Sequence, residues 1–117
     1  KGIGILAHST LGKGLLTGRY RPGHVFPDDD ERSGMDRFRG EAFARSIETT
    51  DKLNKLALEK GLSLVQLAVA WVLRDPVVTC ALIGAKTPEQ ILDYLPAVEA
   101  QLSVDDLARI DAIQEAE

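Results

Sequence analysis

Residues 77–90 read VVTCALIGAKTPEQ, which is the pattern of a strand followed by a helix, with a very short loop between them. Residues 77–83 are β-branched or otherwise apolar almost throughout, which is typical of a strand covered on both faces of a parallel sheet. Gly84 ends this strand, and the sequence Thr-Pro-Glu-Gln that follows shortly after supplies an N-cap and a proline at the first helical position. We therefore predict a strand at 77–83 and a helix at 88–99, which Pro96 should kink or shorten.

A second strand is predicted at residues 3–7, where an apolar run lies between glycine and the polar residues 8–10. A buried piece of helix is the alternative, but two glycines within three residues disfavour a helix start. A long loop follows at 11–40, with glycines, prolines and the acidic run at 28–31, which we expect to be solvated. Loops of this length are usually lids, binding loops or disordered segments.

The remaining helices are predicted at 42–60, 64–74 and 104–115 from apolar residues spaced three or four apart. Gly61 stands where a helix commonly ends in the left-handed conformation. A Ser-x-x-Gln pattern that begins at Ser63 has the spacing of a capping box, and Ser103 is expected to cap the last helix.

Strands that alternate with helices place the chain in the α/β class, with a parallel sheet. Two strands cannot form a sheet that is buried on both sides, and a complete eight-stranded barrel takes about 250 residues. The missing strands are therefore expected from an upstream segment or from another chain.

The composition and charge of the chain argue against several classes of function and location. The 117 residues are 44% hydrophobic with a net charge of −4, which argues against a nucleic-acid partner. No apolar stretch reaches the roughly 18 to 20 residues of a membrane span, and no leader is evident at Lys1, so we expect a soluble, cytoplasmic protein. The single cysteine, Cys80, fits a reducing compartment and is predicted to be a small core residue. The pattern indicates no metal site.

The glycine-rich segment after the first strand is a candidate anion site. It fails the dinucleotide fingerprint, because the third glycine falls one place late, and it fails the P-loop pattern as well. What remains is a turn in which hydroxyls and backbone N–H groups can surround an anion, assisted by Lys13. The relevant residues are Ser9, Thr10, Leu11, Gly12, Lys13 and Gly14. A plain glycine-rich turn is the alternative.

The loop after the second strand is a better candidate, because a helix N-terminus offers N–H donors to a phosphate and Lys86 adds a full charge. A capped helix with a solvated lysine is the alternative. If the two strands are neighbours, both loops lie at one edge of the sheet, where ligands of such folds bind. His8, at the end of the first strand, could contact a ligand or carry a proton.

Several blocks of the chain resemble aldo-keto reductases. Residues 5–18 resemble the segment at the seventh strand of that family, and the segments that begin Asp36-Arg37-Phe38, Leu56-Ala57-Leu58, Gln66-Leu67-Ala68 and Ile83-Gly84-Ala85 follow in the family's order and spacing. The resemblance covers nearly the whole chain and is most specific from Gln66 to Gln90.

The resemblance implies a parallel (β/α)8 barrel, of which this chain would be the last two β/α units plus a C-terminal helix. It also implies NADP(H) as cofactor and hydride transfer to an aldehyde or ketone. Ser9, Thr10, Leu11 and Gly12 would lie along the pyrophosphate, with His8 and Lys13 beside them. Ala85, Lys86 and Thr87, after Gly84, would meet the 2′-phosphate, and Gln90, Asp93 and Tyr94 would lie by the ribose and adenine.

Some positions depart from the family pattern. The family usually has a tyrosine at His8, often a proline at Thr10 and often an asparagine at Tyr94. Nothing in this chain corresponds to the family's catalytic Asp, Tyr, Lys and His, so the chain alone is expected to be inactive. Two alternatives stay open: a truncated binding or assembly module, and a phosphate-binding α/β domain unrelated to redox chemistry.

Overall fold

The computed structural model describes residues 2, 4, 6–7, 15–17, 19–21, 23–76, 78, 80–85 and 87–115. Within these ranges the strands are β1 (Leu6–Ala7) and β2 (Cys80–Ala81). The α-helices are α1 (Gly40–Glu59), α2 (Leu64–Val72), α3 (Pro88–Tyr94), α4 (Pro96–Glu99) and α5 (Val104–Glu115). Short 3-10 helices lie between β1 and α1: η1 (Leu15–Thr17), η2 (Glu31–Gly34) and η3 (Asp36–Phe38).

The two strands are parallel neighbours. Leu6 pairs with Cys80 and Ala7 with Ala81, which is the relationship that the alternation of strands and helices predicted. Both strands are shorter than predicted, and the second is not covered on both faces: Cys80 is exposed, and Leu82 is 49% exposed. The sheet in the described ranges has only two strands, so no further strand extends the pairing or brings a second covering layer.

The prediction of Cys80 as a core residue is therefore wrong. Its thiol lies on the uncovered sheet, where its sulfur donates a weak hydrogen bond to the carbonyl oxygen of Ala81 over 3.6 Å. An apolar strand sequence indicates that a covering layer is needed, and the described residues do not supply that layer over Cys80.

The end of α1 and the start of α2 follow their sequence signals. Gly61 has a φ of 72°, and the N–H of Leu62 donates to the carbonyl oxygen of Ala57 over 2.9 Å, which is the bond that closes a Schellman motif. At the start of α2, Ser63 and Gln66 exchange both hydrogen bonds of a capping box. The two helices therefore turn sharply against each other, with only four residues between them.

Proline divides the helix predicted at 88–99. Pro96 cannot donate an N–H to the preceding turn, so α3 ends at Tyr94 and α4 begins at Pro96, although Leu95 keeps helical angles of −58° and −40°. The expected interruption is thus present. The last helix, α5, has the predicted bounds 104–115. No helix in the described ranges combines the length and apolar character that a bilayer crossing needs.

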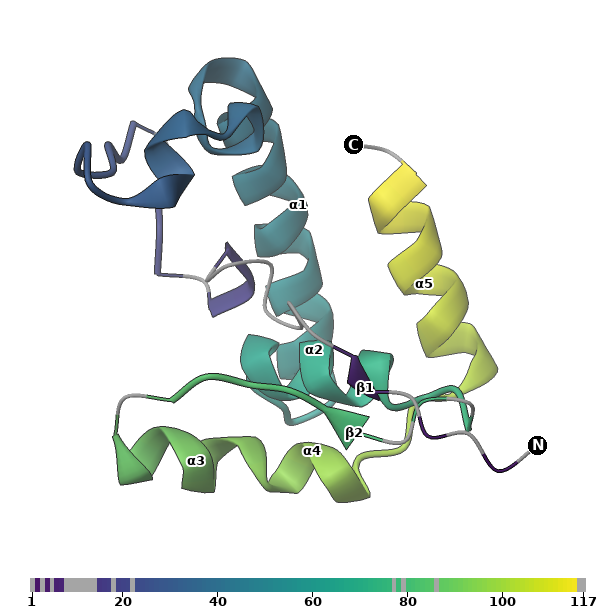
Figure 1. Cartoon of the computed structure of the whole chain (residues 1–117). Coiled ribbons are helices and arrows are strands. Elements are labelled where there is room, and N and C mark those ends of the chain that lie inside the picture. Colours follow the sequence, from purple (N-terminus) through teal and green to yellow (C-terminus); the bar gives the residue numbers. More distant parts are fainter. Residues whose placement is uncertain are drawn as a thin grey trace.

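The core consists of two clusters that α1 connects. The first contains Leu53, Leu56, Ala57, Leu64, Leu67 and Ile110, and it joins α1 to α2 and α5. The second contains Leu15, Phe26, Phe38, Phe43 and Ile47, and it joins α1 to the segment before it. Figure 1 shows α5 beside α1 at the C-terminal end of the chain, and α3 and α4 along the segment that contains β2.

The segment predicted as a long loop at 11–40 is more ordered than expected in its described part. It contains η1, η2 and η3, and it buries Phe26 and Phe38 to 5% and 2% exposure. The rings pack edge to face, with 5.4 Å between their centroids. Asp30, from the acidic run expected to be solvated, accepts the N–H of Arg32 and caps η2. Aromatic side chains thus give this segment a small core of its own.

Candidate functional site

The paired strands determine where the two predicted anion-binding loops start. Because β1 and β2 are parallel and in register at Ala7 and Ala81, the chain leaves both strands at the same edge of the sheet. The candidate residues His8, Ser9, Thr10, Leu11, Gly12 and Lys13 of the first loop, and Lys86 of the second, lie outside the described residues. The others, from Gly84 to Tyr94, are described and can be examined in detail.

The loop after β2 presents an open surface. Gly84, Ala85 and Thr87 are all exposed. Apart from the chain neighbours of Gly84, no atom of the described residues lies within 4 Å of the place where a Cβ on Gly84 would be. The described residues therefore leave the space over this glycine open to a ligand that approaches the backbone.

Tyr94 holds this loop to α3. Its hydroxyl donates a hydrogen bond to the carbonyl oxygen of Gly84 over 3.1 Å. The resemblance predicted a contact of Tyr94 with ribose or adenine. With its proton engaged, the hydroxyl could still accept a hydrogen bond from a ligand, and the half-buried ring could still provide an apolar face.

The start of α3 has the predicted cap. Thr87 accepts the N–H of Gln90 over 3.3 Å, and Pro88 occupies the first turn. The helix is only seven residues long because Pro96 interrupts it, so its aligned peptide dipoles add little positive potential. The electrostatic argument for this loop therefore depends mainly on the charge of Lys86.

Gln66 supports the site, and sequence reasoning assigned it only a capping role. Its side-chain oxygen accepts the N–H of Ser63, while its Nε2 donates to the carbonyl oxygen of Asp93 over 2.8 Å. One amide thus completes the cap of α2 and holds α3 against it. The sequence carries no signal for this bond, because 27 residues separate its partners. Apart from this bonded carbonyl oxygen, Asp93 is exposed.

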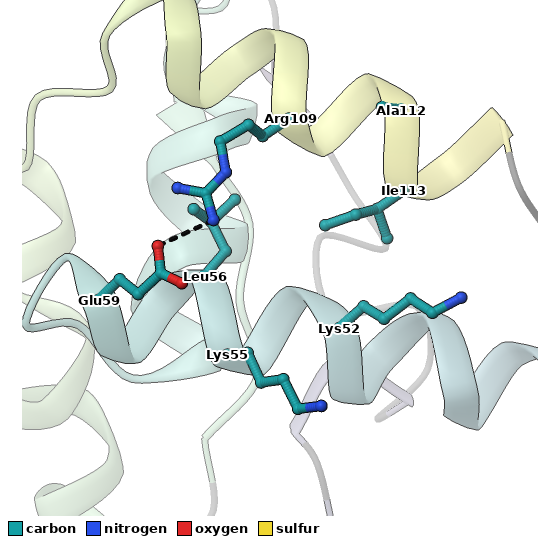
Figure 2. A pocket seen from close by; sticks show the side chains of 7 residues that line it. All are labelled: Lys52, Lys55, Leu56, Glu59, Arg109, Ala112 and Ile113. Atoms are coloured by element: carbon teal, nitrogen blue, oxygen red, sulfur yellow. Dashed lines mark ion pairs between the residues drawn. The ribbon is translucent and has the colours of Figure 1, made fainter.

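A cavity of about 380 Å³ lies elsewhere, between α1 and α5 (Figure 2). Its lining residues are Lys52, Lys55, Leu56, Glu59, Arg109, Ala112 and Ile113, and none of them belongs to the loops after β1 and β2. Glu59 and Arg109 form an ion pair of 2.8 Å across it. In the described part of the chain, no three His, Cys, Asp or Glu side chains gather as a metal site would require.

Comparison with known proteins gives consistent matches. The aldo/keto reductase family model matches residues 1–115. The chain is 37% identical to L-glyceraldehyde 3-phosphate reductase of Escherichia coli over 94% of its length, and 32% identical to protein tas of Escherichia coli over 98%. It covers 33% of each of these relatives, so it spans about a third of their length.

Among solved structures, the chain is similar to a glycerol dehydrogenase from Gluconobacter oxydans, with a TM-score of 0.87 and 34% identity. The match covers 94% of this chain and 33% of the dehydrogenase, which agrees with a chain that forms part of a barrel rather than a complete one. Three observations agree. The strand pair is parallel and is followed by helices, the family model matches almost the entire sequence, and the relatives are 32–37% identical to the chain. The chain belongs to the aldo/keto reductase family.

Proposed function

We propose that this chain is the C-terminal, NADP(H)-binding portion of an aldo-keto reductase, forming the last two β/α units of its barrel and a C-terminal helix. The complete enzyme would reduce an aldehyde or ketone by hydride transfer. The parallel pairing of β1 with β2 carries the proposal, because it starts both candidate anion-binding loops from one edge of the sheet. Relatives named as a reductase and a dehydrogenase support oxidoreductase chemistry.

In this proposal the two loops have different tasks. The N–H groups and hydroxyls of Ser9, Thr10, Leu11 and Gly12 bind the pyrophosphate, with Lys13 nearby, and His8 packs near the nicotinamide. Lys86 binds the 2′-phosphate beside the exposed Ala85 and Thr87, and so favours NADPH over NADH. Gln90, Asp93 and Tyr94 lie by the ribose and adenine.

NADP(H) supplies the hydride when it is bound, and this chain's residues bind and orient it. The acid that protonates the carbonyl oxygen would come from strands outside these 117 residues, since Tyr20 and Tyr94 fall in other motifs. In the described residues, Tyr20 accepts a hydrogen bond from Arg32 and Tyr94 donates one to Gly84. Both tyrosines therefore have structural contacts. We also propose a cytoplasmic location, because Cys80 is exposed and in no disulfide.

Reversing the charge of Lys86 tests the proposal. In the complete enzyme, Lys86→Glu should raise the Kd of NADPH by about 10- to 100-fold, since it replaces a charge-assisted contact with a repulsion. The Kd of NADH, which has no 2′-phosphate, should change by less than about twofold. Titrations followed by nicotinamide fluorescence measure both constants.

Lys55→Glu is the matched control, because it changes the net charge by the same amount at an exposed position on α1. It should leave both constants unchanged. Equal losses of NADPH and NADH affinity in Lys86→Glu would reject the role of Lys86.

A second function, an assembly module, is favoured by the exposed apolar residues of α3, of α4 and of the single residue between them. Ile91, Leu92, Leu95 and Val98 are 54%, 65%, 55% and 70% exposed, which is typical of a face that another segment covers. That segment could be the remainder of the barrel or a separate chain. Carbonyl-dependent oxidation of NADPH by the purified 117-residue chain would contradict the assignment of the catalytic groups to other residues.

A further inference from the structure

The guanidinium of Arg32 is held by hydrogen bonds to two other side chains, Asp30 and Tyr20. Its guanidinium donates from Nε to Asp30 Oδ1 over 2.9 Å and from Nη2 to Asp30 Oδ2 over 2.6 Å, which is a bidentate pair. Nη1 donates to the hydroxyl oxygen of Tyr20 over 2.7 Å. The side chains of Arg32 and Asp30 are only 23% and 22% exposed. These contacts fix Arg32 in one conformation.

The guanidinium also lies over an aromatic ring that belongs to the core. Its central carbon is 4.5 Å from the centroid of Phe26, and the Tyr20 ring packs against Phe26 at 5.1 Å. Asp30, followed by Tyr20, raises the pKa of Arg32 above its ordinary value, and a guanidinium stays charged at any working pH even without such a shift. The Arg32 clamp, by which we mean Arg32 with Asp30, Tyr20 and Phe26, therefore joins a polar network to the second hydrophobic cluster.

That cluster anchors the residues that directly follow the glycine-rich turn. Leu15, the first residue after the turn, is 7% exposed and packs in the cluster with Phe26. Its neighbour Leu16 packs against the first cluster, which contains the start of α2. Consecutive residues thus point into different cores, so η1 cannot shift without disturbing both.

We propose that Arg32 is a positioning residue for dinucleotide binding: by clamping Tyr20 and Phe26 it fixes Leu15, the residue that directly follows the predicted glycine-rich turn at 9–14. This inference rests on the function proposed above, in which that turn binds the pyrophosphate. Arg32 itself touches no cofactor. Its contribution is to fix Leu15, from which the predicted turn extends, before the ligand arrives, which lowers the entropic cost of binding.

We expect a substitution of Arg32 to weaken the binding of the whole cofactor but not of its adenosine 2′-phosphate part. Adenosine 2′-monophosphate carries only the phosphate assigned to the Lys86 loop, whereas NADPH needs the glycine-rich turn as well. Arg32→Lys keeps the charge but loses the planar fork that bonds Asp30 and Tyr20 together. In the complete enzyme it should raise the Kd of NADPH about tenfold, the equivalent of one charge-assisted hydrogen bond, and leave the Kd of adenosine 2′-monophosphate within about twofold.

Arg39→Lys is the matched control. Arg39 lies in the same segment and pairs with Asp36 over 3.0 Å, but both side chains are exposed, at 58% and 98%. The same substitution there should not change either constant. Tyr20→Phe is a milder second variant, since it removes only the hydroxyl acceptor and keeps the ring in place; it should raise the Kd of NADPH about threefold. Isothermal titration with both ligands provides the measurements.

The outcomes separate the two proposals. NADPH binding at the level of the unmodified protein in both Arg32→Lys and Tyr20→Phe overturns the positioning role, as does an equal loss of both ligands in Arg32→Lys. In either case the function proposed above survives if Lys86→Glu still weakens both ligands. Failure of the unmodified complete protein to bind NADPH overturns the proposed function, and the positioning role with it.

Discussion

Asp106 is a single side chain that connects two helices. Its Oδ2 accepts a hydrogen bond from the N–H of Ser103 over 2.9 Å and lies 2.8 Å from the Nζ of Lys60, at the end of α1. In return, Ser103 Oγ accepts the N–H of Asp106 over 3.1 Å. The contact with Lys60, followed by the bonds to Ser103, lowers the pKa of Asp106 from 3.8 to about 2.

Asp106→Asn should therefore destabilise the fold at pH 7. The substitution keeps an oxygen that can accept from Ser103 but removes the charge facing Lys60, and we expect a loss of about 1.5–3 kcal/mol in the free energy of unfolding. Urea-induced unfolding of both proteins, followed by circular dichroism, measures the difference.

The difference should depend on pH in a defined direction. The folded protein binds the proton of Asp106 more weakly than the unfolded chain does, so the carboxylate stabilises the fold above about pH 4. This stabilisation disappears as pH falls from about 4 through 2, and the two proteins should become equally stable there. A gap that stays constant from pH 7 to pH 2 would contradict the role of the charge.

Single residues show which contacts a sequence can reveal. Ser103 was predicted to cap α5, and its partner three residues later belongs to the same local pattern. Lys60 could not be predicted as a partner, because it meets Asp106 only after α5 has packed on α1. Arg32 was not singled out for the same reason: its bond to Tyr20 spans 12 residues of a segment that looks like a loop.

At the scale of helices, Gln66 both caps α2 at Ser63 and bonds to Asp93 in α3, and substitutions can separate these two roles. Gln66→Glu keeps an oxygen to accept the N–H of Ser63 but replaces the donor to Asp93 with a repelling oxygen. We expect a loss of about 1 kcal/mol in stability and faster amide hydrogen exchange in α3, with exchange in α2 unchanged. Hydrogen exchange followed by mass spectrometry resolves the two helices.

Gln66→Ala serves as the comparison, since it removes both bonds and should speed exchange at the start of α2 as well. If Gln66→Glu left α3 as protected as in the unmodified chain, the bond to Asp93 would have no part in holding α3.

Helices were more predictable than strands in this chain. A helix satisfies its backbone hydrogen bonds within itself, so the caps at Ser63 and Gly61 and the break at Pro96 could be identified locally. A strand needs a neighbour, and β2 pairs only at Cys80 and Ala81 in the described ranges. The sequence at 11–40 predicts only a loop, because the packing of Phe26 on Phe38 and Phe43 follows no helical or strand period.

Across the described residues, burial of apolar side chains is uneven. The buried clusters lie around α1, whereas many of the exposed large apolar side chains lie in β1, just after β2 and along α3 and α4, among them Leu6 at 61% and Val98 at 70%. The chain covers a third of the length of its relatives, and exposed apolar side chains of this kind are typical of surfaces that another segment covers. The two strands predicted from the sequence are likewise too few for a sheet that is buried on both faces.

A crystal structure of the complete enzyme with NADPH bound tests the proposed cofactor site most directly. We expect the pyrophosphate against residues 9–12, the 2′-phosphate beside Lys86, and Arg32 still paired with Asp30 and Tyr20. A nucleotide bound in the cavity between α1 and α5, or with its phosphates away from the edge where β1 and β2 end, would contradict this site.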